Sequence, residues 1–350
     1  MFTENGRPNS RHKWVLVGSV VLVFSAVAAV VALRQEWSPP AADTGSSSGA
    51  DQSTFKREPI DPLPREIRLD GAKVALGKRL FNDPLLSRDQ TISCASCHEL
   101  DKGGGDGLAH ARGIGGATGA VNAPSVFNSG LNFRQFWDGR AASLEEQVAG
   151  PLHSPIEMGS SWPEVLARLN QDRSYVRAFA ALYRDGVRSG NVQDAIATFE
   201  RSLITPDSRF DHYLRGEHGA LDAREQAGFQ LFKERGCSAC HQGANIGGNM
   251  YQSLGVFGNY FADRGKDQKE DQGRFNVTGR EEDRHVFKVP SLRNVARTAP
   301  YFHDGSVRQL DEAVRIMGKY QIGRELSRQE IDLIVAFLQT LTGTYQGKPL

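Results

Sequence analysis

The sequence has almost no excess of charge of either sign. Its 42 lysine and arginine residues offset 41 aspartate and glutamate residues, so the formal net charge is +1 over 350 residues. No basic patch stands out, which excludes the usual electrostatic signature of a nucleic-acid-binding protein, and we expect no such partner. The 24% of charged residues suits one or two globular domains rather than a disordered chain.

Cysteine is also scarce, and all four cysteines fall into two short motifs, CASCH at 94–98 and CSACH at 237–241. Cys-x-x-Cys-His is typical of haem c attachment, in which both thiols bond the porphyrin edge and the histidine becomes the proximal iron ligand. Neither motif is followed by the second pair of cysteines that a structural zinc site would need. The alternative is two disulfides, one within each motif. It requires that a histidine follows both cysteine pairs by chance. The motifs predict two covalent haem c groups, bound by Cys94, Cys97 and His98 and by Cys237, Cys240 and His241.

One apolar segment near the N-terminus is long enough to cross a membrane. Residues 14–33 form a charge-free run of 20, and three basic residues precede it. The positive-inside rule predicts a cytoplasmic segment at 1–13, a transmembrane anchor at 14–33 and a globular part outside the cytoplasm. The alternative is a cleaved signal peptide, whose apolar region is usually shorter. Residues 34–54, rich in Ser, Gly, Pro and Ala, predict a flexible linker.

The rest of the sequence repeats itself around the two cysteine motifs. APSVFN at 123–128 corresponds to VPSLRN at 289–294, and FWDGR at 136–140 corresponds to FHDGS at 302–306. Corresponding residues of these segments differ by 166, whereas the cysteine motifs differ by 143. The second copy therefore has 23 additional residues between its haem motif and the repeated segments.

Helical patterns accompany both copies. Similar amphipathic phrases precede the haem motifs at 74–81 and 225–232, and a capping box opens an apolar stripe at 327–338. We predict a mainly α-helical fold of two class I cytochrome c-like domains, at 55–210 and 211–350.

The sixth iron ligand is predicted to differ between the two copies. Beyond the apolar run, the sequence contains only Met158, Met250 and Met317. Met317 ends a short predicted helix that starts near Leu310, and the residue in register in the first copy is Pro151, which cannot bind iron. His/Met ligation suits electron transfer, whereas a vacant position admits a small oxidant. We predict Met317 as a ligand of the second haem, with a core-filling role as the alternative.

Two polar side chains near Pro151 suit the chemistry of an open haem. Cleavage of a peroxide needs a base that moves a proton between the two oxygens and a hydrogen-bond donor that orients the molecule. Glu157 and Gln147 fit these roles. From composition alone, Glu157 is equally expected on the surface, where most glutamates lie.

In this set and order of motifs, the sequence resembles the bacterial dihaem cytochrome c peroxidase family, which includes the MauG-like enzymes. The resemblance runs from about residue 58 to 343 and rests on both haem motifs and on the segments 122–159, 235–248 and 299–314. It implies that the N-terminal haem is the peroxidatic centre and that the C-terminal haem receives electrons.

The resemblance also implies roles for individual residues. Gln147 and Glu157 lie on the distal side of the first haem, and Met317 is a ligand of the second. Trp137 matches the family's tryptophan between the haems, an aromatic bridge for electrons. In the second copy the equivalent position is His303, for which we expect a polar contact or a role as an alternative ligand.

Two further expectations follow from the resemblance. The family binds calcium at the domain interface, and Asn122, Thr298 and Pro300 match those ligands. Members that need prior reduction carry a histidine at the position of Ile114, which cannot coordinate iron. We predict a high-spin first haem that reacts with peroxide without reductive activation. His110 is the alternative blocking ligand, because it lies with Ile114 in the glycine-rich segment 102–120, which we expect to be mobile.

The expected function is that of a cytochrome c peroxidase, which reduces hydrogen peroxide to water with electrons from an external donor. A small periplasmic cytochrome c, a cupredoxin and membrane quinol are the candidate donors. The anchor predicts a location on the periplasmic side of the bacterial inner membrane, and the family is commonly dimeric, which suggests a homodimer.

Two alternative functions remain at this stage. MauG-like oxidation of Trp or Tyr on a partner protein is disfavoured by Met317, because MauG closes its second haem with tyrosine, although Tyr320 lies close by. A dihaem electron carrier without a catalytic site is disfavoured by the lack of a sixth ligand in the first copy.

Overall fold

The computed structural model describes residues 58–350. The predicted cytoplasmic segment, the anchor at 14–33 and the linker at 34–54 lie outside the described residues. Within 58–350, no helix combines the length and apolar character needed to cross a bilayer.

The first half of the described chain is a group of helices joined by long turns. α1 begins after Asp70, whose carboxylate accepts hydrogen bonds from the backbone N–H groups of Ala72 and Lys73. The helices of this half are α1 (Gly71–Phe81), α2 (Leu144–His153), α3 (Trp162–Gln171), α4 (Arg173–Leu182) and α5 (Ser189–Ser202). Short 3₁₀ turns lie at Pro84–Leu86, Cys94–Ser96, Leu100–Lys102, Ile114–Gly116 and Ser129–Leu131.

The second half adds helices and two small antiparallel sheets. Its helices are α6 (Arg209–Leu214), α7 (Ala223–Glu234), α8 (Tyr260–Arg264), α9 (Phe275–Thr278), α10 (Leu310–Ile316), which a π-helical turn at Met317–Gln321 extends, and α11 (Arg328–Gln339). β1 (Tyr251–Ser253) pairs with β2 (Val286–Lys288), and β3 (Thr344–Tyr345) pairs with β4 (Lys348–Pro349). Short 3₁₀ turns lie at His218–Ala220, Cys237–Ala239, Lys269–Gln272, Glu281–Asp283 and Val295–Arg297.

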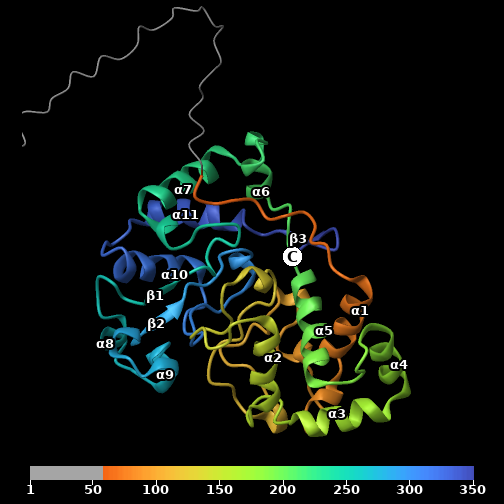
Figure 1. Ribbon diagram of the computed structural model, residues 1–350. Coiled ribbons are helices and arrows are strands. Elements are labelled where there is room, and N and C mark those ends of the chain that lie inside the picture. Colours follow the sequence, from red (N-terminus) through yellow and green to blue (C-terminus); the bar gives the residue numbers. More distant parts are fainter. Residues whose placement is uncertain (1–57) are drawn as a thin grey trace, which may run out of the picture. The chain divides into compact units, whose positions relative to one another are not determined.

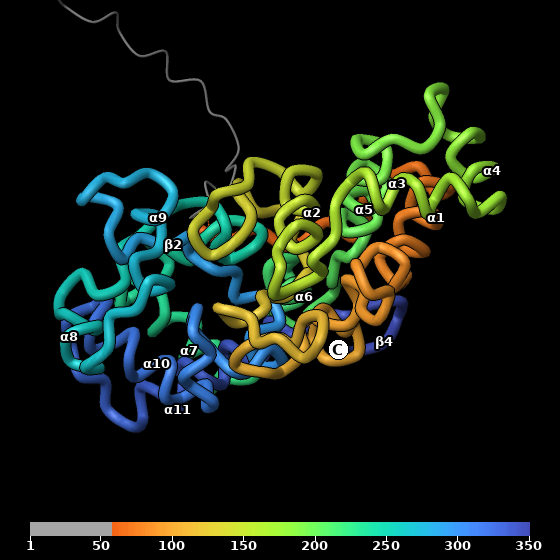
Figure 2. The backbone as a smooth tube through the Cα atoms, turned by 90° about the horizontal axis from the view of Figure 1, so that it is seen from below, coloured from red at the N-terminus to blue at the C-terminus, as the bar shows by residue number. Residues whose placement is uncertain are grey.

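The structure is mainly helical and contains two cytochrome c-like domains, as predicted. In both views, α1, α3, α4 and α5 gather on one side, and α7, α10 and α11 on the other (Figures 1 and 2). One hydrophobic core surrounds α1 and α5, and a second surrounds α7 and α11. A third, smaller cluster contains Tyr260, Phe261 and Ile316.

Both ends of the described chain pack against the domain at the other end. Ile60 and Phe210 belong to the core around α7 and α11, although the predicted boundary assigns them to the first domain. Tyr345 and Leu350, near the C-terminus, pack against the core around α1 and α5. The boundaries at 55–210 and 211–350 stay a prediction.

The repeated phrases before the haem motifs share a glycine at a close helix crossing. A Cβ atom on Gly77 of α1 would lie 1.9 Å from the carbonyl oxygen of Ala195 in α5. A Cβ atom on Gly228 of α7 would lie 2.0 Å from the carbonyl oxygen of Leu333 in α11. Each domain therefore brings two helix backbones together at a position where only glycine fits.

Gly77→Ala should therefore destabilise the protein, although alanine is normally the better helix former. Forcing α1 away from α5 is expected to lower the free energy of unfolding by about 1–3 kcal/mol, the usual cost of overpacking. Gly71→Ala is the matched control, because nothing lies within 4 Å of a Cβ atom at that position of the same helix. Thermal unfolding measures both variants, and equal midpoints for the two would contradict the close-crossing argument.

Candidate haem sites

The first cysteine motif opens onto a cavity of about 440 Å³. Cys94, Cys97 and His98 contribute to its wall. Nδ1 of His98 lies 3.2 Å from the carbonyl oxygen of Gly104, so this nitrogen donates a hydrogen bond and Nε2 keeps the lone pair that can bind iron. Burial lowers the pKa of His98, which favours the neutral ring that coordinates metals.

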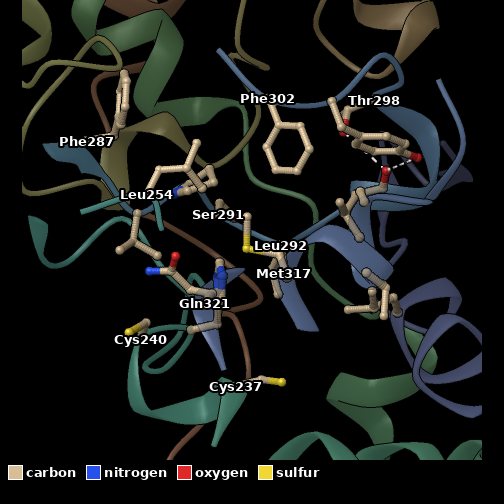
Figure 3. Close-up of a pocket in the computed structure, with 18 of the residues that line it drawn as sticks. Cys237, Cys240, Leu254, Phe287, Ser291, Leu292, Thr298, Phe302, Met317 and Gln321 are labelled. Carbon is tan, nitrogen blue, oxygen red and sulfur yellow. Dashed lines mark hydrogen bonds between the residues drawn. The ribbon is translucent and has the colours of Figure 1, made fainter. Parts of the chain in front are cut away.

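The second motif lines a cavity of about 500 Å³ with the same arrangement. Nδ1 of His241 lies 3.3 Å from the carbonyl oxygen of Ile246, and burial lowers the pKa of this histidine to about 4. Met317, at the junction of α10 and the π-helical turn, lines the same cavity as Cys237 and Cys240 (Figure 3). The structure thus brings these four predicted residues together.

Both cavities fit a haem c group. None of the four cysteines forms a disulfide within residues 58–350. The two sulfurs of each motif line one cavity together with a histidine that has a free ring nitrogen, as two thioether bonds and one iron ligand require. Each volume lies in the range of typical cofactor pockets, roughly 300–1,000 Å³.

The two predicted distal residues lie on the wall of the first cavity. Gln147 is on α2, and Glu157 is in the turn that follows this helix. Burial raises the pKa of Glu157, and a hydrogen bond with Ser154 and the charge of Arg140 oppose this shift only in part. A carboxylate with a raised pKa suits proton transfer near neutral pH.

No strong iron ligand stands where Met317 stands in the second copy. Pro151, inside α2, occupies that position and lines the first cavity. The methionine that lines the first cavity is Met158, which also packs in the hydrophobic core around α1 and α5.

The glycine-rich segment before Glu157 is packed rather than loose. A Cβ atom on Gly113 would lie 1.9 Å from the carbonyl oxygen of Ile156. The N–H of Ile114 donates to the carbonyl oxygen of Glu157 at 2.8 Å, and the Ile114 side chain is buried. His110 lines neither cavity in the described part of the chain. The segment therefore supports the turn that bears Glu157, and the mobility expected from its glycines is not what the packing suggests.

The two cavities share a wall. Asn122, Trp137 and Phe287 line both of them. The indole Nε1 of Trp137 donates to the carbonyl oxygen of Asn122 at 2.9 Å. Its ring meets His303 edge-on, with centroids 6.4 Å apart. Trp137 is therefore placed between the two haem sites.

His303 also has a polar partner. Its Nε2 lies 2.6 Å from Oδ1 of Asp271, and both side chains are buried. Its ring stacks on Phe287 with centroids 4.6 Å apart. His303 also lines the second cavity. Of the two roles expected for His303, this geometry favours the polar contact.

The three residues predicted to bind calcium contribute to the lining of the second cavity. Asn122, Thr298 and Pro300 all line it. The side-chain amide of Asn122 donates to the carbonyl oxygen of Leu108 at 2.8 Å, which orients this side chain. Among the described residues, no group of three or more His, Cys, Asp or Glu side chains could hold a metal. A site made of an amide and carbonyl oxygens is a different kind of site, so calcium stays a prediction.

The sequence motifs did not indicate Phe287, Lys288 and Glu200, each of which lines a cavity. Phe287 and Lys288 lie directly before the repeated segment at 289–294, and Lys288 is in register with Asn122, which was a usable signal. Glu200 of α5 is buried at the first cavity, where burial raises its pKa to about 8. No pattern in the sequence distinguishes Glu200 from a surface residue of an amphipathic helix.

Two cavities with Cys-x-x-Cys-His walls in a helical frame define a dihaem c-type cytochrome. Residues 71–219 match the family model for di-haem cytochrome c peroxidase, and residues 225–342 match that for cytochrome c. The chain is 50% identical over 291 residues to cytochrome c peroxidase Ccp of Escherichia coli strain K12, covering 83% of this chain and 62% of that protein.

Two further proteins agree with this match. Cytochrome c551 peroxidase of Nitrosomonas europaea is 45% identical over 82% of this chain and 84% of its own length. A crystal structure of a MauG-like protein associated with microbial copper homeostasis superposes with a TM-score of 0.71 at 31% identity, over 84% of this chain and 96% of that one. The chain belongs to the di-haem cytochrome c peroxidase family.

Proposed function

We propose that this protein is a cytochrome c peroxidase that reduces hydrogen peroxide to water with electrons from an external donor. The observation that carries the proposal is the difference between the two cavities. Met317 lines the second cavity, whereas the first has Pro151 at that position and Glu157 and Gln147 on its wall. The names of the relatives at 45–50% identity support the same activity.

Each side chain at the first cavity has a distinct task in this proposal. Bound through Cys94, Cys97 and His98, haem would supply the iron at which the peroxide O–O bond is cleaved. Glu157 holds the proton that passes from the near oxygen to the far one, and Gln147 donates a hydrogen bond that orients the peroxide. Two protons and two electrons convert each peroxide molecule to two water molecules.

Electrons are proposed to enter at the second haem, bound through Cys237, Cys240, His241 and Met317. His/Met ligation raises the reduction potential of a haem, which suits it to receive electrons from a soluble donor. Trp137, on the wall shared by both cavities, is the proposed bridge to the first haem.

MauG-like oxidation of a partner protein is the alternative activity. It would favour a tyrosine ligand, and Tyr320 is the candidate. The Tyr320 hydroxyl instead donates to Oδ2 of Asp263 at 3.0 Å, and Tyr320 does not line the second cavity. Met317 does line it, which favours the peroxidase.

We also propose where the protein is located and what else it binds. We propose attachment to the periplasmic side of the bacterial inner membrane through residues 14–33, with cleavage there as the alternative. The electron donor is a cytochrome c, a cupredoxin or quinol. Calcium binds at Asn122, Thr298 and Pro300. The protein assembles as a homodimer.

Steady-state peroxide consumption with reduced cytochrome c, a reduced cupredoxin and a quinol tests the proposed activity. Rapid oxidation of at least one donor is expected. Cyanide binding to the oxidised protein separates an enzyme from a carrier, because a carrier with two closed haems binds none. Lack of peroxide consumption with every donor would contradict the proposal.

The first haem is expected to be high-spin in the fully oxidised protein and to react with peroxide before any reduction. The physical reason is that Ile114 is buried away from the cavity and Pro151 offers no ligand. Electron paramagnetic resonance of the oxidised protein, followed by mixing with peroxide, measures both properties. A wholly low-spin spectrum without reaction would mean that a side chain blocks the iron, and His110→Ala and Met158→Leu would then identify it.

A further inference from the structure

Lys288 is a buried cation that has no side-chain partner among the described residues. This last residue of β2 is only 7% exposed. Its ammonium makes no ion pair and no hydrogen bond within residues 58–350, and desolvation alone lowers its pKa to about 8. A buried charge normally requires compensation, because removing it from water costs several kcal/mol.

Over residues 58–350, the lining of the second cavity offers no acidic side chain that could neutralise the charge of Lys288. Lys288 lines this cavity, and no Asp or Glu does so in the described chain. Phe287, which precedes Lys288, also lines this cavity (Figure 3). The N–H of Lys288 donates to the carbonyl oxygen of Trp137 at 2.8 Å, which fixes the backbone at the boundary between the two cavities.

The other cations on this cavity already have acidic partners. Arg293 pairs with Asp211 at 2.8 Å, Arg235 with Glu330 at 2.6 Å, and Lys102 with Glu99 at 2.9 Å. Lys288 is thus the one cation on the wall of the second cavity whose charge nothing within residues 58–350 neutralises. Its position calls for an anionic group supplied by whatever fills the cavity.

We propose that Lys288 is the counter-ion of a haem carboxylate in the second cavity. Haem c carries two propionate carboxylates, which are as costly to bury unpaired as the lysine itself. The inference rests on the proposed function in one respect, namely that the second cavity holds haem. It adds a positioning residue that orients this haem and, by its positive charge, favours the reduced state of the iron.

Lys288→Met and Lys288→Arg test the pairing. The readout is the midpoint potential of the second haem in the holoprotein, measured by spectroelectrochemical titration, with haem content measured separately. The Met variant should shift the one-electron equilibrium about tenfold toward the oxidised state, which corresponds to ~59 mV. The Arg variant, which keeps the charge, should stay within about threefold of the wild type.

Lys102→Met is the matched control, because Lys102 lines the same cavity but is exposed and paired with Glu99. Its potential should equal that of the wild type. A Lys288→Met protein with both haems and an unchanged potential would overturn the role of Lys288 and leave the peroxidase proposal intact. Wild-type protein with a single haem per chain would overturn the peroxidase proposal itself.

A neutral variant that fails to attach the second haem would leave no potential to measure. Lys288→Gln is therefore prepared beside the Met and Arg variants. Attachment in the Arg variant and loss in both neutral variants would support a charge requirement. Equal loss in all three would contradict it and indicate a requirement for the shape of lysine.

Discussion

Glu157→Gln is expected to lower peroxide turnover by about 10²-fold or more, which is the typical contribution of a positioned base to the rate. Both haems should stay attached in this variant. Glutamine keeps the size of the side chain on the wall of the first cavity and removes its capacity to hold a proton. Turnover with a reduced donor measures the loss, and an unchanged visible spectrum shows that the haem sites are intact. Wild-type turnover in this variant would remove Glu157 from the mechanism.

The pH profile gives an independent test of the same residue. Burial raises the pKa of Glu157, and only the ionised form can accept a proton. The rate should therefore fall as the pH decreases through this raised pKa, at a higher pH than an exposed glutamate would require. The Gln variant should lack this limb, whereas Glu66→Gln, at an exposed position, should keep the wild-type profile.

Met317→His is expected to lower the potential of the second haem by on the order of 0.1 V or more, within the roughly 0.8 V range that axial ligands span. The reason is that the thioether ligand, rather than histidine, raises the potential. A redox titration measures the change. Peroxide turnover should fall with it, because a donor matched to the original potential would no longer reduce this haem readily.

Met250→Leu is the matched control, since Met250 lines neither cavity in the part of the chain that the structure describes. Its potential should be that of the wild type. An unchanged potential in Met317→His would mean that another side chain closes the second haem. His303 would be the first candidate, because it lines this cavity and Tyr320 does not.

Local motifs and the internal repeat carried most of the sequence prediction. Each Cys-x-x-Cys-His motif places its own thiols and histidine on one short turn, so distant contacts are not needed to identify it. The repeat offset identified Met317 and Pro151 as corresponding positions, and the structure places each on the wall of the corresponding cavity. Glu157 and Gln147 were first selected because their chemistry suits an open haem, and the family resemblance then assigned them to its distal side.

The features that escaped prediction depend on contacts distant in sequence. Lys288 lies at the end of β2, which pairs with β1 so that Tyr251 is opposite Lys288; the segment 254–285, which contains α8 and α9, separates the two strands. No local sequence pattern in that segment predicts the pairing of β1 with β2. The glycines near Ile114 were misleading for a related reason: composition alone does not distinguish a flexible loop from a backbone that approaches another backbone closely.

The exchange of chain ends between the two cores bears on how the protein can be divided. Ile60 fills part of the core around α7 and α11, while Tyr345 and Leu350 complete the core around α1 and α5. If the chain were cut between the haem domains, each fragment would lack apolar side chains that complete its core. The same fragment would expose side chains that normally pack in the core of the other domain. We therefore expect the two halves to unfold together, and transferring one haem domain to another protein would require both ends of the chain to be redesigned.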